Sequence, residues 1–215
     1  MFQRVIDLAP ENPNGYVGLG GMYYQQERWE EARALFEKSL TVRPTYRASN
    51  NLATLYFFEE RDYAKAAQMF EKVLVFDDRD YFVWGNLAAA YYWAPGERPK
   101  ARAAYERAAK MAEEQRRVNP RDSKLLCDLA DYYAMLGKRN HALPLLEEAL
   151  ALAPNDVGLM FSAGDTYEQL GRREESLKLI GKALELGYPI KVVEHSPGLA
   201  KLRADPRFET LRNNR

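Results

Sequence analysis

Three absences narrow the class of this chain before any motif is considered. Cys127 is the only cysteine, so no disulfide can form within the chain, which fits a reducing compartment. No run of about 18 apolar residues is present, so the sequence predicts no membrane-spanning helix. The N-terminal segment has no small-residue cleavage site and does not read as a signal peptide. We therefore expect a cytoplasmic location.

The chain also lacks an excess of either charge. Lysine plus arginine number 31, as do aspartate plus glutamate, so the formal net charge is zero. A neutral chain gives no reason to expect general binding to nucleic acid or to an anionic membrane. The two histidines, His141 and His195, lie far apart and lack metal-ligand spacing with Cys127. We expect no catalytic residue, no metal site and no cofactor.

What the chain does contain is one pattern that recurs five times at a spacing of about 34 residues. Its tyrosines are Tyr23, Tyr56, Tyr91, Tyr133 and Tyr167. The small residues that follow them are Ala32, Ala66, Ala101, Ala142 and Ser176. The units close at Pro10, Pro44, Pro120 and Pro154, with Asp78 in the same slot. Such a repeat indicates a stacked array, in which function lies on a surface made by stacking.

Each unit reads as a pair of helices. Between Tyr16 and Tyr24 the apolar residues recur at three- and four-residue steps, which is one face of a helix. A second apolar stripe runs from Trp29 to Leu40, and Pro44 ends it because proline cannot continue a helix. The unit is therefore two antiparallel helices of roughly 14 residues each, joined by a tight turn. Small residues lie where the two helices cross, and Ser176 adds a hydroxyl there that needs a partner.

The pattern resembles the tetratricopeptide repeat. Tyr16-x-x-Leu19-Gly20-x-x-Tyr23, followed by Ala32-x-x-x-Phe36 and Pro44, fits that family slot by slot, and the resemblance covers about residues 1–189. It implies an all-α fold, a right-handed α-solenoid of antiparallel helix pairs with a C-terminal capping segment. The expected parts are the second helix of a truncated repeat at 1–10, repeats at 11–44, 45–78, 79–120, 121–154 and 155–188, and a cap at 189–215.

The two ends and the third repeat depart from the pattern. The chain begins partway through a repeat, so we expect it to be the tail of a longer protein. The apolar stripe of Phe2, Val5 and Ile6 must pack either on the first complete repeat or on another copy of the chain. The third repeat predicts one long helix from about Glu97 to Val118, whose charged end is either simply solvated or a docking ledge.

The C-terminal segment predicts a cap of short helices near 189–194, 197–203 and 206–212. Gly187 is placed as a helix C-cap, and Ser196 and Asp205 each precede a proline as N-caps. The apolar residues expected to cover the fifth repeat are Leu199, Leu202, Phe208 and Leu211. This segment resembles the end of the tetratricopeptide regions in large bacterial regulators that carry serine/threonine kinase, adenylate cyclase or winged-helix domains.

Family geometry implies that the first helices line a concave groove. The residues expected there are Tyr24, Asn50, Asn51, Phe57, Phe58, Asn86, Tyr92, Trp93, Asp128, Asp131, Asp165 and Glu168. Asparagines in equivalent slots offer a donor and an acceptor to an extended peptide, and aromatic rings offer contact area. Tyr24 and Tyr92 fill slots that serve either packing or contact. The acidic half should prefer a basic partner segment.

The sequence therefore predicts a non-catalytic interaction or scaffold module that binds a peptide or protein segment in its groove, as part of a bacterial regulatory protein. Gly21, Thr54 and aspartates occupy the slots in which the family's carboxylate clamp needs lysine and arginine, which argues against recognition of an acidic C-terminal tail. The alternative is self-association through the N-terminal helix or through the long helix of the third repeat.

Overall fold

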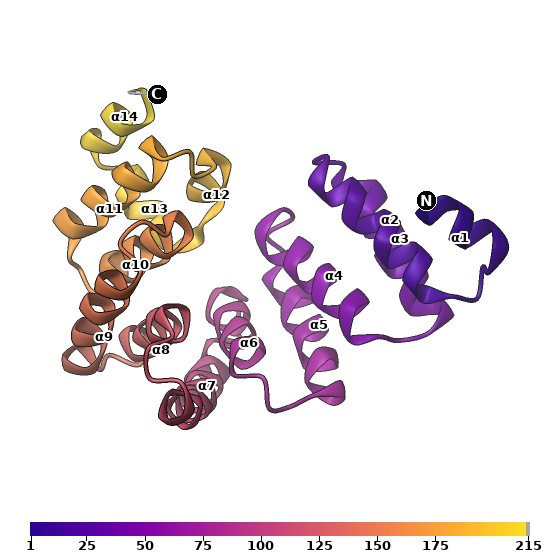
Figure 1. The fold of residues 1–215 in the computed structure, drawn as a ribbon, viewed down its shortest axis with the longest axis horizontal. Coiled ribbons are helices and arrows are strands. Elements are labelled where there is room, and N and C mark those ends of the chain that lie inside the picture. Colours follow the sequence, from indigo (N-terminus) through magenta and orange to yellow (C-terminus); the bar gives the residue numbers. More distant parts are fainter. Residues whose placement is uncertain (214–215) are drawn as a thin grey trace. The chain divides into compact units, whose positions relative to one another are not determined.

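The computed structural model describes residues 1–213, and all regular secondary structure within that range is helical. The chain divides into two compact units, Met1–Ala101 and Arg102–Arg215, and the long helix α7 (Arg98–Val118) begins in the first and continues in the second. Figure 1 shows the succession of helices along the chain.

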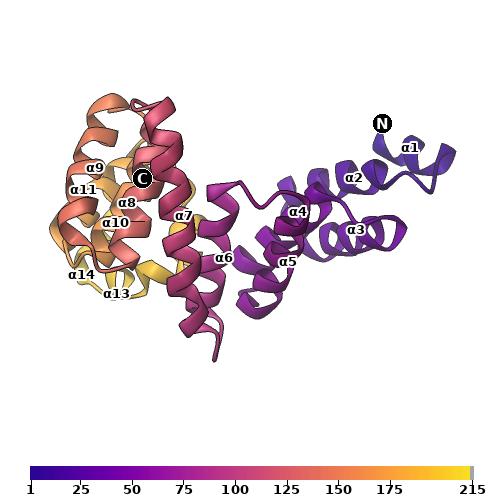
Figure 2. The ribbon, with the colours of Figure 1, turned by 90° about the horizontal axis from the view of Figure 1, so that it is seen from below.

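The first unit consists of a short helix, two complete helix pairs and the first helix of a third pair. Its helices are α1 (Phe2–Leu8), α2 (Pro13–Gln25), α3 (Trp29–Val42), α4 (Tyr46–Phe58), α5 (Tyr63–Phe76) and α6 (Tyr81–Trp93), followed by the start of α7. Within this unit α2 packs on α3, α4 on α5, and α5 on α6. Figure 2 shows α2 and α3 running side by side.

The second unit contains the rest of α7, two further helix pairs and a series of short C-terminal helices. These are α8 (Ser123–Met135), α9 (Arg139–Leu152), α10 (Val157–Gln169), α11 (Arg173–Glu185), α12 (Ile190–His195), the 3-10 helix η1 (Pro197–Leu199), α13 (Ala200–Arg203) and α14 (Pro206–Asn213). The long α7 and the short C-terminal helices lie where the sequence predicts them. Positions 214 and 215 of the predicted cap lie outside the described residues.

Close approach between paired helices depends on small residues, as the sequence predicted. A Cβ at Gly20 would lie 2.7 Å from Cε1 of Phe36 and 3.3 Å from the carbonyl oxygen of Ala32, so only glycine fits there. In the fifth pair, the buried Ser176 hydroxyl donates to the carbonyl oxygen of Gly164 at 2.6 Å. That bond supplies the partner which the serine requires.

The ends of the helices follow ordinary capping chemistry, with one correction. Asp205 accepts a hydrogen bond from the backbone N–H of Arg207 at 3.1 Å, which agrees with its prediction as an N-cap. Ser196 occupies the predicted N-cap position before Pro197, but its side chain makes no capping bond, because its hydroxyl turns back and donates to the carbonyl oxygen of Val192 at 2.9 Å. Gly187 has a φ of +92°, a conformation that favours glycine at a helix end.

The apolar stripe of the N-terminal helix packs inward. A Cβ added at Gly18 of α2 would collide with the ring of Phe2, and one at Gly15 would lie 3.2 Å from Val5 and 3.0 Å from Ile6. Because neither glycine has a side chain, α1 can pack closely against α2. Of the two arrangements that the sequence left open, this is packing on the first complete repeat.

A set of tyrosine–glutamate bonds joins successive pairs, and sequence analysis did not predict it. The Tyr56 hydroxyl donates to Glu37 at 2.9 Å, and the Tyr133 hydroxyl donates to Glu113 at 2.9 Å. Lysines lie over the same rings, 5.3 Å from the centroid at Tyr56 and 5.4 Å at Tyr133. Both tyrosines thus tie a first helix to the preceding second helix.

Candidate functional site

The first helices of the N-terminal unit are almost free of charge. Among the residues of α2, α4 and α6, the only charged side chain is Arg47. The surface that these three helices offer is called the first-helix face here. Amide and aromatic side chains supply its chemistry.

A cavity of about 210 Å³ opens on this face between α2 and α4. The residues that line it are Gly21, Tyr24, Gln25, Phe36, Asn51 and Thr54. A Cβ at Gly21 would meet no atom within 4 Å, so the glycine leaves the space open. Sequence analysis named Tyr24 and Asn51 as groove residues, and it named Gly21 and Thr54 only as slots that lack the cations of the carboxylate clamp. That Gly21 leaves such a slot without any side chain was the signal for an open space.

The polar groups around the cavity differ in how far they are already paired. The Tyr24 hydroxyl donates to Glu59 Oε1 at 3.2 Å, and burial together with the Glu59 carboxylate raises the pKa of Tyr24. The Thr54 hydroxyl donates to the backbone carbonyl of Asn50 at 2.9 Å. The side-chain amide of Asn51 has no hydrogen-bond partner among residues 1–213. Together with the Gln25 amide, which makes no hydrogen bond among these residues either, it is left to bind something else.

The other two asparagines predicted for the groove are also half-buried. Asn86 lies five residues before Tyr91, as Asn51 lies five before Tyr56, so the two occupy the same slot on α6 and α4. Within the described part of the chain, the side chain of Asn86 makes no hydrogen bond either. Asn50 is half-buried beside Asn51 on α4.

Four of the five aromatic residues predicted for the groove, all except Tyr24, belong to one cluster of ring contacts. Phe57 contacts Phe58 with ring centroids 4.9 Å apart and Tyr63 at 5.2 Å. The ring centroid of Trp93 lies 6.5 Å from that of Tyr63, and Trp93 packs against the buried core. Phe57 is itself 8% exposed, so it is a core residue and not a groove residue as predicted. Phe58 is 38% exposed and stays available to a ligand.

Tyr92 closes the same cluster. Its ring centroid lies 5.0 Å from that of Trp93, and the guanidinium of Arg98 lies 4.2 Å from the Tyr92 centroid. The Arg98 guanidinium also donates to the Tyr92 hydroxyl. Tyr92 is half-buried. Part of its ring packs against Trp93 and part stays exposed, so it takes both of the roles that the sequence left open.

In the second unit the first helices carry carboxylates instead. Lys124 pairs with Asp128 at 2.9 Å. Burial, with the neighbouring Asp165 and Asp128 carboxylates, raises the pKa of Asp131 to about 8. Burial also raises the pKa of Asp165 to about 6, against a hydrogen bond from the Gln169 amide. Desolvation disfavours the charged form of a carboxyl group, so both aspartates hold a proton more readily than usual.

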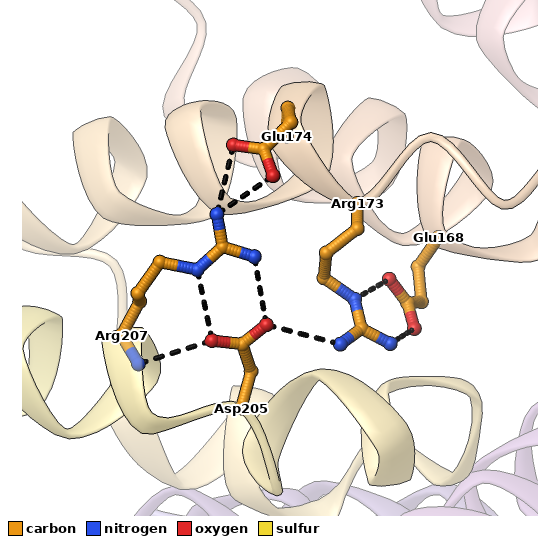
Figure 3. Close-up of polar contacts among 5 residues, drawn as sticks. All are labelled: Glu168, Arg173, Glu174, Asp205 and Arg207. Atoms are coloured by element: carbon orange, nitrogen blue, oxygen red, sulfur yellow. Dashed lines mark hydrogen bonds and ion pairs between the residues drawn. The ribbon is translucent and has the colours of Figure 1, made fainter.

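The C-terminal segment contacts or covers two of the acidic residues that were predicted for the groove. The first of them is Glu168. Figure 3 shows Arg173 binding both oxygens of Glu168 and reaching Asp205, which Arg207 binds in turn. The Glu168 side chain is only 6% exposed. Its carboxylate therefore serves to fasten the cap and presents little surface to a partner, contrary to its predicted place in the groove.

The same segment covers Asp165. The 3-10 helix η1 packs on α10, and a Cβ at Gly198 would lie 2.7 Å from Asp165 Oδ1. Phe161 of α10 stacks on Tyr188 with centroids 4.5 Å apart. Of the four acidic residues predicted for the groove, Asp128 and Asp131 are left clear of these contacts.

The remaining candidates for chemistry are structural. Cys127 is 1% exposed, and burial raises the pKa of its thiol, so it is not an activated nucleophile. Across residues 1–213 no three histidine, cysteine or acidic side chains come together as a metal site. None of the described helices is both long and apolar enough to cross a bilayer.

Comparisons with known proteins agree with the geometry. Residues 12–75 and 82–155 match one sequence model of the tetratricopeptide repeat, and residues 127–187 match a second. The crystal structure of TTC0263, a thermophilic TPR protein of Thermus thermophilus, is 25% identical with a TM-score of 0.59, over 93% of this chain and 98% of that one. The structure of YrrB, described as a TPR protein with an unusual peptide-binding site, is 19% identical with a TM-score of 0.55, over 90% and 96%.

One curated relative is the general transcriptional corepressor trfA of Dictyostelium discoideum. The identity is 27% over 140 residues, which is 65% of this chain and 9% of that protein. The chain thus spans less than a tenth of the length of this relative. These likenesses support the repeat fold, and the expected resemblance to the tails of bacterial regulators stays a prediction.

Proposed function

This chain belongs to the tetratricopeptide repeat family, and we propose that it is a non-catalytic module that binds an extended segment of a partner protein on its first-helix face. The observation that carries the proposal is the cavity between α2 and α4, with the unpaired amide of Asn51 in its wall. An amide offers both a donor and an acceptor, which match the N–H and C=O groups of an extended backbone.

Two further features support binding along this face. Asn86 repeats the position of Asn51 one helix pair later, so a bound chain would meet a second amide. Phe58 and Trp93 offer aromatic surface at the end of the same helices, and such rings are frequent energetic anchors of interfaces. In this proposal the module acts as one part of a larger regulatory protein of bacterial type.

The test is retention of peptides from a displayed random library by the full chain. Peptides retained by the native chain should bind the Asn51→Ala variant about 5- to 150-fold more weakly, since a buried unpaired backbone group costs roughly 1–3 kcal/mol. Gln68→Ala on α5 is the matched control, because Gln68 is exposed and lies on a second helix. Equal binding by the native chain and Asn51→Ala would remove the first-helix face as the site.

As a narrower part of the same proposal, the second unit binds a basic segment of the partner. Asp128 is the carboxylate that would receive it, since Asp165 and Glu168 are engaged by the cap and burial keeps Asp131 largely protonated at neutral pH. Such binding should weaken in high salt, because exposed charge pairs are screened.

Self-association is the second candidate function. Packing of α1 on α2 takes up the N-terminal stripe, so α7 is the helix that supports this alternative. Val118 at its end is 86% exposed. Light scattering on the full chain decides: a dimer that Val118→Ser dissociates would support association through α7, and a monomer would exclude it. The same measurement without residues 1–10 tests the N-terminal helix.

A further inference from the structure

We propose that the first-helix face selects a peptide segment without charged residues and takes one of its apolar side chains in the cavity beside Gly21. This inference rests on the proposed function and names the chemistry of the partner. It follows from the charge of the face, from the size of the cavity and from the presence of a glycine that packing does not require.

The charge of the face excludes a charged occupant. The three helices α2, α4 and α6 offer one charged residue, Arg47, and the carboxylate of Glu59 at the edge is already bonded to Tyr24. A charged peptide side chain placed here would lose hydration, and because Glu59 already accepts from Tyr24, little charge pairing would offset that cost. An uncharged segment loses little, and its backbone groups meet the amides of Asn51 and Asn86.

The size of the cavity fits a single side chain. Its volume of about 210 Å³ lies below the roughly 300 Å³ at which pockets for small molecules begin. Phe36 and Tyr24 supply ring surface to it, and Gln25, Asn51 and Thr54 supply polar groups. An apolar side chain would contact the rings while its own backbone remained within reach of the polar groups.

Gly21 has no role in packing. At Gly20, the preceding residue, the ring of Phe36 leaves no room for a Cβ. At Gly21 no atom lies within 4 Å of the Cβ position, and glycine is unfavourable inside a helix. The fold would therefore accept a larger residue at position 21, whereas the cavity would be filled by it.

The experiment selects peptides of nine residues from a displayed random library on the full chain. Retained peptides should carry few charged residues and share one Leu, Ile, Met or Phe. Their Kd should change less than about twofold between low and high salt, because no charge pair is formed or screened. A selected peptide, synthesised alone, is the probe for the variants.

Gly21→Leu should weaken that probe at least tenfold while its helical circular dichroism and melting temperature stay equal or rise. Gly21→Ala, which adds only one methyl group, should give a smaller loss. Met22→Leu is the matched control, since Met22 is the exposed neighbour on α2 and should bind as the native chain does.

The outcomes separate the two proposals. Retained peptides that are rich in acidic or basic residues and sensitive to salt would overturn the inference and leave the proposed function standing. Full binding by a folded Gly21→Leu chain would do the same, because it would place the peptide outside the cavity. Failure of the native chain to retain any peptide would overturn both.

Discussion

The two units are built from the same repeat and differ in what their first helices present. Two residues before the repeat's tyrosine, the first unit has Gly21, Thr54 and Ala89, whereas the second has Asp131 and Asp165. The recurring slots fix how helices pack, so they are alike in both units. The slots between them are free to vary, so they set the chemistry of each unit's surface.

The units also differ in what covers that surface. In the second, the segment from α12 to α14 packs over the last helix pair, and Val193, Leu199 and Leu202 are all 0% exposed. In the first, the cavity between α2 and α4 stays open. A solenoid needs its last apolar face covered, and here the cover also removes part of an acidic surface from use.

The largest expected effect concerns this cover. Leu202→Ala should destabilise the second unit by about 2–5 kcal/mol, because the side chain is fully buried and its removal leaves a cavity. Hydrogen exchange of α11 in the full chain measures the effect. The control is Leu186→Ala, since Leu186 is 53% exposed and its loss should cost little. Equal exchange in the native chain and Leu202→Ala would mean that the cap is not part of the core.

The next effect tests the aspartate that lies two residues before the repeat's tyrosine in the second unit, Asp131. The pKa of folded Asp131, about 8, lies above the unfolded value of about 3.9. The folded state thus binds the proton more tightly, so this contribution to stability is complete below about pH 4 and is lost as the pH rises toward 8. Asp131→Asn should therefore stabilise the second unit by a few kcal/mol at pH 8, since each pKa unit corresponds to about 1.4 kcal/mol, and leave it little changed at pH 4.

Urea unfolding at both pH values, followed by circular dichroism, measures this difference. Asp7→Asn in the first unit is the control, because Asp7 is exposed and should change stability at neither pH. A gain from Asp131→Asn that is the same at pH 4 and pH 8 would contradict the proposed titration.

The sequence predicted what depends on local periodicity and missed what depends on a distant partner. The lengthened α7 followed from the count of residues between Asp78 and Pro120, and the cap followed from its prolines and apolar residues. Phe57 was misplaced because its burial depends on Tyr63, across the turn. Glu168 was placed on a binding surface because nothing in the local pattern indicates that Arg173 will bind both of its oxygens.

The smallest expected effect compares the repeats through their tyrosines. Tyr133→Phe removes the hydroxyl bond to Glu113 and should cost about 0.5–1.5 kcal/mol, and Tyr56→Phe should cost a similar amount through Glu37. Tyr23 is the matched control. The residue twenty positions before it is Gln3, which bonds to Asp7 instead, so Tyr23 makes no bond to a glutamate of the preceding helix. Its ring lies 4.1 Å from the Arg28 guanidinium, a contact that phenylalanine keeps, so Tyr23→Phe should cost less than either of the other two changes.

The pH dependence gives this comparison a second measurement. Burial and the bond to Glu113 raise the pKa of Tyr133 to about 12, above the unfolded value of about 10. This contribution is therefore present below about pH 10 and is lost as the pH rises toward 12. Tyr133→Phe should flatten that loss, measured by urea unfolding from pH 9 to 11.5. A slope identical to that of the native chain would show that the bond to Glu113 does not couple the helices.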